Sequence, residues 1–254
     1  MKKVFAIFIG ILSLCLFVSC AKEEATEALT HAEYLAAEKG STVTIEAYIQ
    51  GKQSWWENNG IGVASFYLQD QDGGYFVYNL PCTKDDYDKK LTAGTKIQVT
   101  GNKTEWSGEV EIDGLTEGAE ATYKVLNAKK FIANPKDVTE DLGKDLLVSQ
   151  NMAVTFKNLE VAASTYEDEN KEQHTAAFMY KWNNSGTRGD DLYITLTDGT
   201  NTLSAVVESY LCDENSDVYK AVEALQIGDV ITIEAFLYWY NGAQPHITKV
   251  TKSN

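Results

Sequence analysis

The sequence predicts an all-β protein built from two tandem copies of one small five-stranded barrel. Two stretches 134 residues apart, Leu91–Thr100 and Leu225–Glu234, have nearly the same pattern. Each is a leucine, a glycine turn and then alternating branched residues, the period of a half-buried strand. Further residues match in the same order, namely Leu68, Asp70, Cys82, Gly94, Trp106 and Gly108 with Leu196, Asp198, Cys212, Gly228, Tyr240 and Gly242. Because the order is kept and the spacing drifts only in loops, we interpret the two halves as repeats of one domain.

A short helix is expected ahead of the first copy. Thr30 and Glu33 have the spacing of a capping box, and Gly40 fits a position just after the end of a helix. Residues 41–49 then alternate with period two, which predicts the first strand.

The other strands of the first copy come as two hairpins. Their ranges are 63–69 and 75–80 around a turn at 70–74, and 96–102 and 109–112 around a turn at 106–108. The polar stretch 82–91 between the hairpins predicts one helical turn, and 121–127 closes the unit. We expect residues 51–60 to form a loop that carries Trp55 and Trp56.

The second copy repeats this order of elements. Strands are predicted at 151–161, 192–196, 203–208, 230–238 and 244–249, with a helix at 217–225 and the turn Asn241-Gly242. A long polar insert, 162–190, replaces the loop that carries the two tryptophans in the first copy.

Five strands with a helix or helical turn between strands 3 and 4 are the plan of the OB-fold, a small Greek-key barrel. The chain also resembles bacterial exported lipoproteins with tandem OB-fold domains, on the motifs Tyr34–Ile49, Phe66–Asp70 and Leu91–Thr100. The resemblance covers 30–127 well and 145–252 less well, because the insert interrupts the second copy. An immunoglobulin-like sandwich is the rival architecture, and it is disfavoured because the Leu-x-x-Gly signature follows a helical segment in both copies.

The first 20 residues form a targeting segment. Lys2 and Lys3 precede an apolar run, and Phe17-Val18-Ser19-Cys20 resembles a bacterial lipobox, in which the cysteine is lipidated. The resemblance implies an exported protein anchored to the cell membrane or outer membrane through Cys20. A cleaved signal peptide and an N-terminal membrane anchor are the alternatives, although the run is short for a span of about 20 residues.

The expected domains follow from these boundaries. A tether at 21–29 leads to the first OB-fold domain at 30–127, a linker at 128–144, and the second domain at 145–254. Cys82 and Cys212 occupy matching places in the two copies, and cysteines in separate domains rarely lie close enough to bridge. We therefore expect two half-buried free thiols, although an exported protein permits a disulfide.

The charge of the chain restricts its partners. The whole chain has a net charge of −15, and removal of residues 1–19 leaves 20 basic against 37 acidic residues. Nucleic-acid binders usually present basic patches to phosphates, so nucleic acid is the less favoured partner. We favour solubility outside the cell as the explanation of the acidity.

Aromatic residues gather where an OB-fold binds ligands. The loops between strands 1 and 2 and between strands 4 and 5 flank one open face, and all five tryptophans lie in or beside these loops. Such rings can stack on sugars or bases; packing at the barrel ends and contact with a protein are the alternatives. The candidate ligand-binding residues are Trp55, Trp56, Tyr67, Tyr75, Tyr78, Trp106, Trp182, Tyr238, Trp239 and Tyr240.

We find no signature of catalysis, and predict no catalytic residue, cofactor or metal site. His31, His174 and His246 fall in different elements, so no histidine cluster indicates zinc. Asp70-x-Asp72-Gly73 predicts a hairpin turn, since the other ligands of a calcium loop are absent.

The sequence therefore predicts a non-enzymatic, surface-anchored binding module of the bacterial cell envelope whose ligand is a glycan or a peptide. The alternatives are an exported oligonucleotide-binding protein and a scaffold that contacts other envelope proteins.

Overall fold

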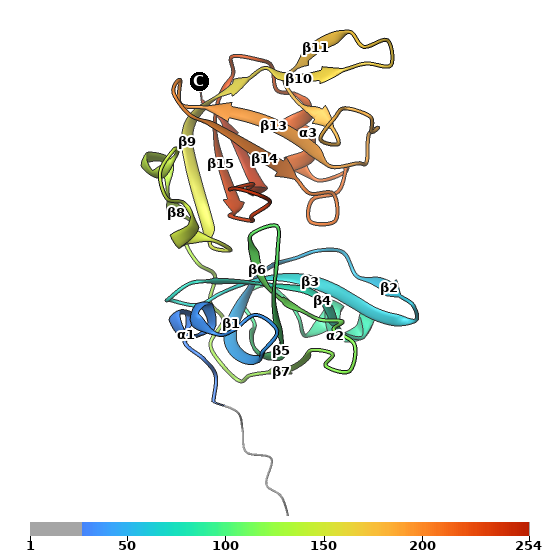
Figure 1. Ribbon diagram of the computed structural model, residues 1–254, viewed down its shortest axis with the longest axis vertical. Helices are drawn as coiled ribbons and strands as arrows, with labels where there is room; N and C mark the ends of the chain where they lie inside the picture. The colour runs from blue at the N-terminus through green and yellow to red at the C-terminus, as the bar shows by residue number, and fades with distance from the viewer. Residues whose placement is uncertain (1–26, 254) are drawn as a thin grey trace, which may run out of the picture.

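A computed structural model describes residues 27–253, which form two β-barrels joined by one connecting segment (Figure 1). The targeting segment, Cys20 and residues 21–26 of the expected tether lie outside the described residues. Within the described part, no helix combines the length and the apolar character needed to cross a membrane.

The first barrel is a closed OB-fold. Its barrel strands are β1 (Thr42–Lys52), β3 (Ile61–Gln69), β4 (Gly74–Pro81), β5 (Lys96–Trp106) and β6 (Glu109–Asp113). β1 pairs antiparallel with both β3 and β5, and β4 pairs parallel with β6, which closes the barrel. The additional elements are α1 (His31–Ala36), β2 (Trp56–Asn58), α2 (Lys84–Lys89) between β4 and β5, and β7 (Thr122–Val125).

The second barrel has the same order and pairing. Its barrel strands are β9 (Ala153–Ala162), β13 (Leu192–Thr197), β14 (Thr202–Val207), β15 (Val230–Phe236) and β16 (His246–Lys252), with α3 (Asp217–Glu223) between β14 and β15. β9 pairs antiparallel with β13 and β15, and β14 pairs parallel with β16. The predicted all-β class and tandem OB-fold are confirmed.

Equivalent glycines of the two copies have the same conformation and form the same hydrogen bond. Gly94 and Gly228 both adopt a left-handed φ, +82° and +90°. Each donates its N–H to the first strand of its own barrel, Gly94 to Ile49 O at 2.7 Å and Gly228 to Val161 O at 2.9 Å. A residue with a Cβ is strained at such a φ. The two glycine turns that match in the sequence therefore form the same hydrogen bond, which connects the segment after each helix to the first strand of its barrel.

Three segments differ from their expected state. The loop at 51–60 contains β2, because Trp56 pairs with Val63 of β3. The insert at 162–190 contains a hairpin of β10 (Ser164–Glu167) and β11 (Gln173–Ala176), and β12 (Met179–Tyr180). In the expected linker, β8 (Lys136–Asp137) pairs with β9, and Val138 and Leu142 pack in the second core. The two 3-10 helices before β9 are η1 (Thr139–Asp141) and η2 (Leu147–Ser149).

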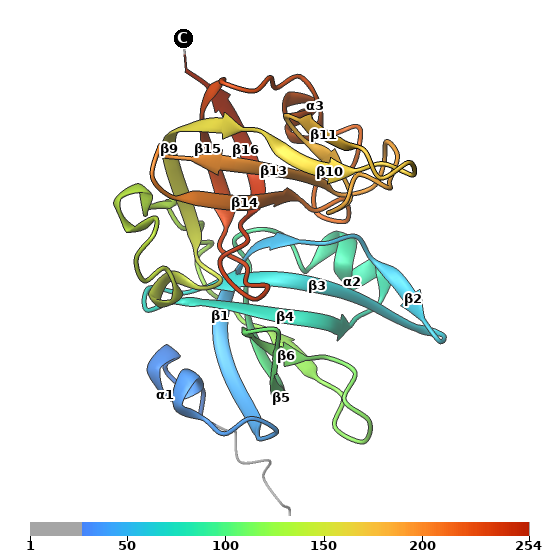
Figure 2. The ribbon, with the colours of Figure 1, turned by 45° about the horizontal axis from the view of Figure 1, so that its top comes forward.

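The two barrels pack against each other through an aromatic contact. Figure 2 shows the loop between β15 and β16 reaching from the second barrel to the first. Tyr67 of β3 stacks on Phe236 of β15, with ring centroids 4.4 Å apart and planes inclined by 13°. Phe76, Ala133 and Ala153 complete this buried cluster. Through this contact, the outer face of β3 and β4 packs against the second barrel.

A buried carboxyl group joins the barrels beside this cluster. Glu109 is fully buried, and its two oxygens accept hydrogen bonds from Asn151 Nδ2 at 2.6 Å and from the Trp239 N–H at 2.9 Å. A Cβ on Gly74 would lie 2.2 Å from the backbone carbon of Asn151. Because the Trp239 N–H and the backbone of Asn151 both take part in these contacts, the relative placement of the barrels is closely defined.

We predict that Phe236→Ala lowers the free energy of unfolding by about 3–5 kcal/mol, the usual cost of emptying a buried phenylalanine site. Urea denaturation measures this change. Val230→Ala, on the exposed end of the same strand, is the control and should change stability by about 0.5 kcal/mol or less. Equal small effects of the two variants would show that the contact between barrels contributes nothing to stability.

Candidate ligand cleft between the two barrels

A cleft of about 810 Å³ opens where the barrels meet. Its volume lies within the usual range for small-molecule sites. Both barrels supply its lining, which consists of Gln53, Phe76, Tyr78, Trp106, Trp182, Asp191, Tyr193, Val206, Glu208, Tyr210, Tyr238, Tyr240, Gln244 and His246.

Exposed aromatic rings form the walls of the cleft. Tyr78 and Trp106 come from the first barrel, and Trp182, Tyr210 and Tyr240 from the second, and all five are exposed. Exposed rings from both sides of one concave site provide flat apolar surfaces for a ligand.

The loops that follow strand 4 in each barrel meet at this cleft. Trp106 and Tyr240, which are equivalent residues of the repeat, lie with ring centroids 5.1 Å apart. The Asn241 N–H donates to Ser107 O at 2.7 Å. The same loop of each copy thus contributes one ring to a shared wall.

Alternation along the strands selects which side chains reach the cleft. On β4, Tyr75 and Val77 point into the first core, whereas Phe76 and Tyr78 point outward. On the second barrel the outward face includes Val206 and, directly after β14, Glu208. Successive side chains of a strand lie on opposite faces, so these neighbours take opposite roles.

Glu208 is the most unusual polar residue of the lining. Its exposed fraction is 9%, its Oε1 accepts a weak hydrogen bond from the Tyr210 N–H at 3.3 Å, and its Oε2 is buried without a hydrogen-bond partner. Burial, and secondarily the charge of Asp191, raise the pKa of Glu208 to about 7. Asp191 itself accepts from the Ser209 N–H and hydroxyl.

A smaller hollow of about 320 Å³ shares Tyr78, Trp106 and Tyr238 with the cleft and adds Glu111. Glu111 is 7% exposed, and burial together with the charge of Asp113 raises its pKa to about 7. Within the described residues, neither lining includes a lysine or an arginine. The polar character of the cleft is therefore acidic.

A chain of hydrogen bonds connects two residues of the cleft lining, Gln53 and His246, through Tyr67. Gln53 Nε2 donates to the Tyr67 hydroxyl oxygen at 3.5 Å, which leaves that hydroxyl free to donate to His246 Nδ1 at 2.5 Å. The His246 ring also stacks on Tyr238, with centroids 4.4 Å apart. Burial lowers the pKa of His246 to about 3, so the imidazole stays neutral and adds no positive charge.

The structure brings five of the ten candidate residues together and separates the others. The five in the cleft are Tyr78, Trp106, Trp182, Tyr238 and Tyr240. Trp239 lies beside the cleft, partly buried against the second core and above Gly108.

The other four candidates do not line the cleft. Tyr67 faces the correct side of its strand, but Phe236 covers it. Tyr75 lies in the first core, where its hydroxyl donates to Asp70 Oδ2 at 2.9 Å. Trp55 Nε1 donates to Cys82 O at 3.0 Å, and Trp56 is exposed on β2. Of the five tryptophans, Trp106 and Trp182 line the cleft, whereas Trp55 and Trp56 lie outside its lining.

Sequence reasoning missed Tyr193, Tyr210, Asp191 and Glu208. Alternation along β14 was the available signal for Glu208, since it continues the outward face of Val206. Tyr210, in the loop after β14, had no such signal, because its place in the cleft depends on how the two barrels meet.

The two cysteines of the described structure form no disulfide. Cys82 and Cys212 are free thiols, one buried and one partly exposed. Burial raises the pKa of each to about 11, which keeps both protonated and unreactive near neutral pH.

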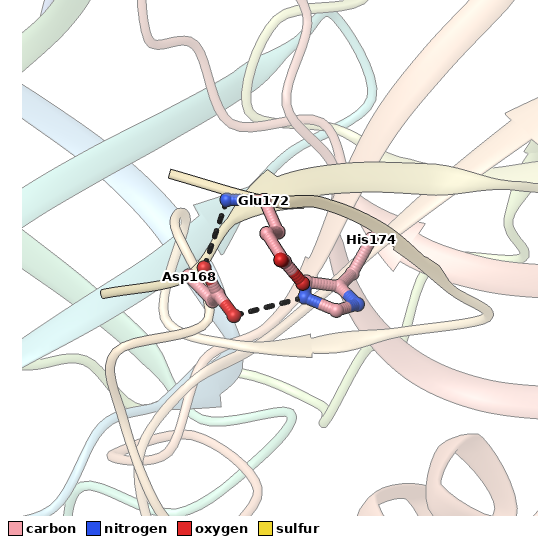
Figure 3. A group of neighbouring side chains, drawn as sticks. All are labelled: Asp168, Glu172 and His174. Carbon is pink, nitrogen blue, oxygen red and sulfur yellow. Dashed lines mark hydrogen bonds and ion pairs between the residues drawn. The ribbon is translucent and has the colours of Figure 1, made fainter. Parts of the chain in front are cut away.

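One group among residues 27–253 combines three potential metal ligands, and the sequence analysis did not anticipate it. Figure 3 shows Asp168, Glu172 and His174 together on the β10–β11 hairpin. Asp168 Oδ2 accepts from His174 Nε2 at 3.1 Å, and its Oδ1 accepts from the backbone N–H of Asn170 and of Glu172, each at 2.9 Å. These bonds close the turn of the hairpin and explain the arrangement of Asp168 and His174 without an ion.

No protein-family model and no curated protein matches this chain. Solved structures do resemble it. A murine DNA-binding protein bound to double-stranded DNA is 11% identical with a TM-score of 0.37, covering 83% of this chain and 99% of its own. A replication protein A heterotrimer bound to single-stranded DNA is 11% identical with a TM-score of 0.32, covering 84% and 49%.

The single-stranded DNA binding protein of Thermus aquaticus is 13% identical with a TM-score of 0.27, covering 85% and 95%. Similarities of this size transfer no property to this chain. The strand order and pairing of the chain itself define it as a tandem OB-fold protein with a composite cleft between its barrels.

We predict that His246 makes the protein less stable in acid. Its folded pKa of about 3 lies below the unfolded value of about 6.5, so below pH 6.5 the unfolded chain binds a proton that the folded protein does not. Relative to His246→Gln, the unmodified protein should lose about 2 kcal/mol of unfolding free energy between pH 7 and pH 5. Urea denaturation at the two pH values measures this difference. Parallel pH dependence of both proteins would contradict the prediction.

Proposed function

We propose that the cleft binds an oligosaccharide without chemically changing it. The observation that carries the proposal is the lining itself, with exposed aromatic rings from both barrels around carboxylate and amide groups. Aromatic rings stack on the apolar faces of sugars. The oxygens of Asp191, Glu208, Gln53 and Gln244 can accept hydrogen bonds from sugar hydroxyl groups.

An oligonucleotide is the alternative ligand. OB-folds as a class bind oligonucleotides and oligosaccharides on the same face, and several of the similar structures contain DNA. Their similarity to this chain is too low to transfer a ligand. Among the described residues, the cleft lining contains no lysine or arginine. Phosphate binding depends on such residues, so the acidic lining favours the sugar.

We further propose that the protein is displayed at the bacterial cell surface on a lipidated Cys20. The lipobox-like sequence Phe17-Val18-Ser19-Cys20 supports this location. A glycan-binding module held at a membrane surface would meet extracellular polysaccharides directly.

We predict that the chain from residue 21 onward binds neutral or amino-sugar oligosaccharides, detected by tryptophan fluorescence and quantified by calorimetry. Trp106→Ala should weaken binding at least about tenfold, equal to about 1.4 kcal/mol, because one wall of the cleft is lost. Trp56→Ala removes an exposed tryptophan outside the cleft and should leave the affinity unchanged.

Two results would count against this function. One is sugar binding that Trp106→Ala leaves unchanged. The other is preferential binding of a single-stranded oligonucleotide with steep salt dependence, which is the signature of phosphate recognition and would support the alternative.

We predict that Cys20→Ala in the full chain moves the protein from the membrane fraction to the soluble fraction of an expressing bacterium, because the lipidated atom is lost. Fractionation followed by immunoblotting measures the distribution. Ser13→Ala, inside the targeting segment, is the control. Persistence of Cys20→Ala in the membrane fraction would indicate an uncleaved membrane anchor instead.

A further inference from the structure

Two buried glutamates near the cleft differ in one respect that bears on the ligand. Glu109 is fully buried, and each of its oxygens has a hydrogen-bond donor. Glu208 is nine-tenths buried and lines the cleft, yet its Oε2 has no donor. Burying a carboxyl oxygen without a hydrogen-bond partner is costly, so a ligand that supplies the donor would gain that energy.

Within residues 27–253, no basic side chain of the lining balances the acidic groups of the cleft. Asp191 and Glu208 line the cleft, and Glu111 lines the hollow that continues it. A neighbouring hollow that shares Asp191 includes Lys181, but Lys181 Nζ lies 3.4 Å from Asp190 Oδ1. That lysine already faces its own carboxylate partner, so the counter-charge missing from the cleft would come from the ligand.

The aromatic walls suit the same charge. The face of a tyrosine or tryptophan ring attracts a cation, by about 0.5–1 kcal/mol at exposed sites and more where water is excluded. Tyr193, Tyr210 and Tyr238 line the same cleft as Glu208. The Tyr210 N–H also donates to Glu208 Oε1, which places this residue directly beside the carboxyl group.

We propose that the oligosaccharide bound in the cleft carries a free, protonated amino group, and that Glu208 accepts a hydrogen bond from it. This inference rests on the proposed function of the cleft as a sugar site. A hydroxyl group would supply a donor to Glu208 but no positive charge, and the cleft lining holds Asp191 and Glu208 with no lysine or arginine among the described residues. An ammonium group supplies both the donor and the charge, which makes an amino sugar the better ligand.

The test is calorimetry at pH 7 on the chain from residue 21 onward, with three tetrasaccharides of β-1,4-linked glucosamine, N-acetylglucosamine and glucose. We expect the glucosamine tetramer to bind at least about tenfold more tightly than the other two. N-acetylation removes the charge and keeps the ring, so this pair isolates the amine. A tetralysine peptide serves as a fourth probe, which carries amines without sugar rings.

The variant Glu208→Gln tests whether Glu208 causes the preference for the amine, since glutamine keeps the shape of the side chain and loses its charge. It should lower the affinity for the glucosamine tetramer at least about tenfold, and by a larger factor than it lowers the affinity for the neutral tetramers. Glu160→Gln, an exposed site on β9 away from the cleft lining, removes the same net charge and should leave all affinities unchanged.

The other outcomes separate the two proposals. Equal affinity for the three sugars overturns the amine requirement and leaves the sugar site standing. Absence of binding by any sugar overturns both. Tighter binding of tetralysine than of the glucosamine tetramer would indicate that the ligand is an amine-bearing peptide, and would overturn the proposal of an amino sugar. Because the unmodified protein decides among these outcomes, the proposal does not depend on how Glu208→Gln folds.

Discussion

The meeting of two equivalent loops, the one after β5 and the one after β15, is the contact on which the site depends. The carboxyl group of Glu109, at the start of β6, bonds to the Trp239 N–H in the second loop, and Asn241 bonds to Ser107 in the first. Glu109 is buried, and burial raises its pKa well above the ordinary value. Removing one partner of a buried carboxyl group is costly, so these bonds strongly favour one arrangement of the barrels.

This arrangement changes what an OB-fold face can do. The outer surface of strands 2 and 3 is the usual ligand surface of the fold, and in this chain each barrel turns that surface toward the other. Tyr67 is buried where it stacks on Phe236. Tyr78 and Tyr193 lie at the edge of this contact and line the cleft. The cleft is thus composite, with walls that neither barrel would form alone.

The repeat is symmetric in its framework and asymmetric in its loops. The glycine turns at Gly94 and Gly228 and the loop residues Trp106 and Tyr240 correspond, and the last two residues meet in space. Between strands 1 and 2, however, the first copy has the short β2 hairpin, and the second has the insert that contains β10, β11 and Trp182. Of these two segments, only the longer insert places a tryptophan in the cleft lining. The two barrels therefore contribute different residues to the cleft.

The sequence by itself determined the five barrel strands, the helix between strands 3 and 4 and the OB-fold of each copy, because alternation, caps and glycine turns are local signals. It also indicated that the loops after strand 4 carry rings of the site. Only the tertiary structure decided that Tyr75 is buried, that Trp55 packs on the first barrel, and that Glu208 lies unpaired beside Tyr210. Those outcomes depend on how side chains far apart in sequence pack, and above all on how one barrel covers the face of the other. No local pattern contains that information.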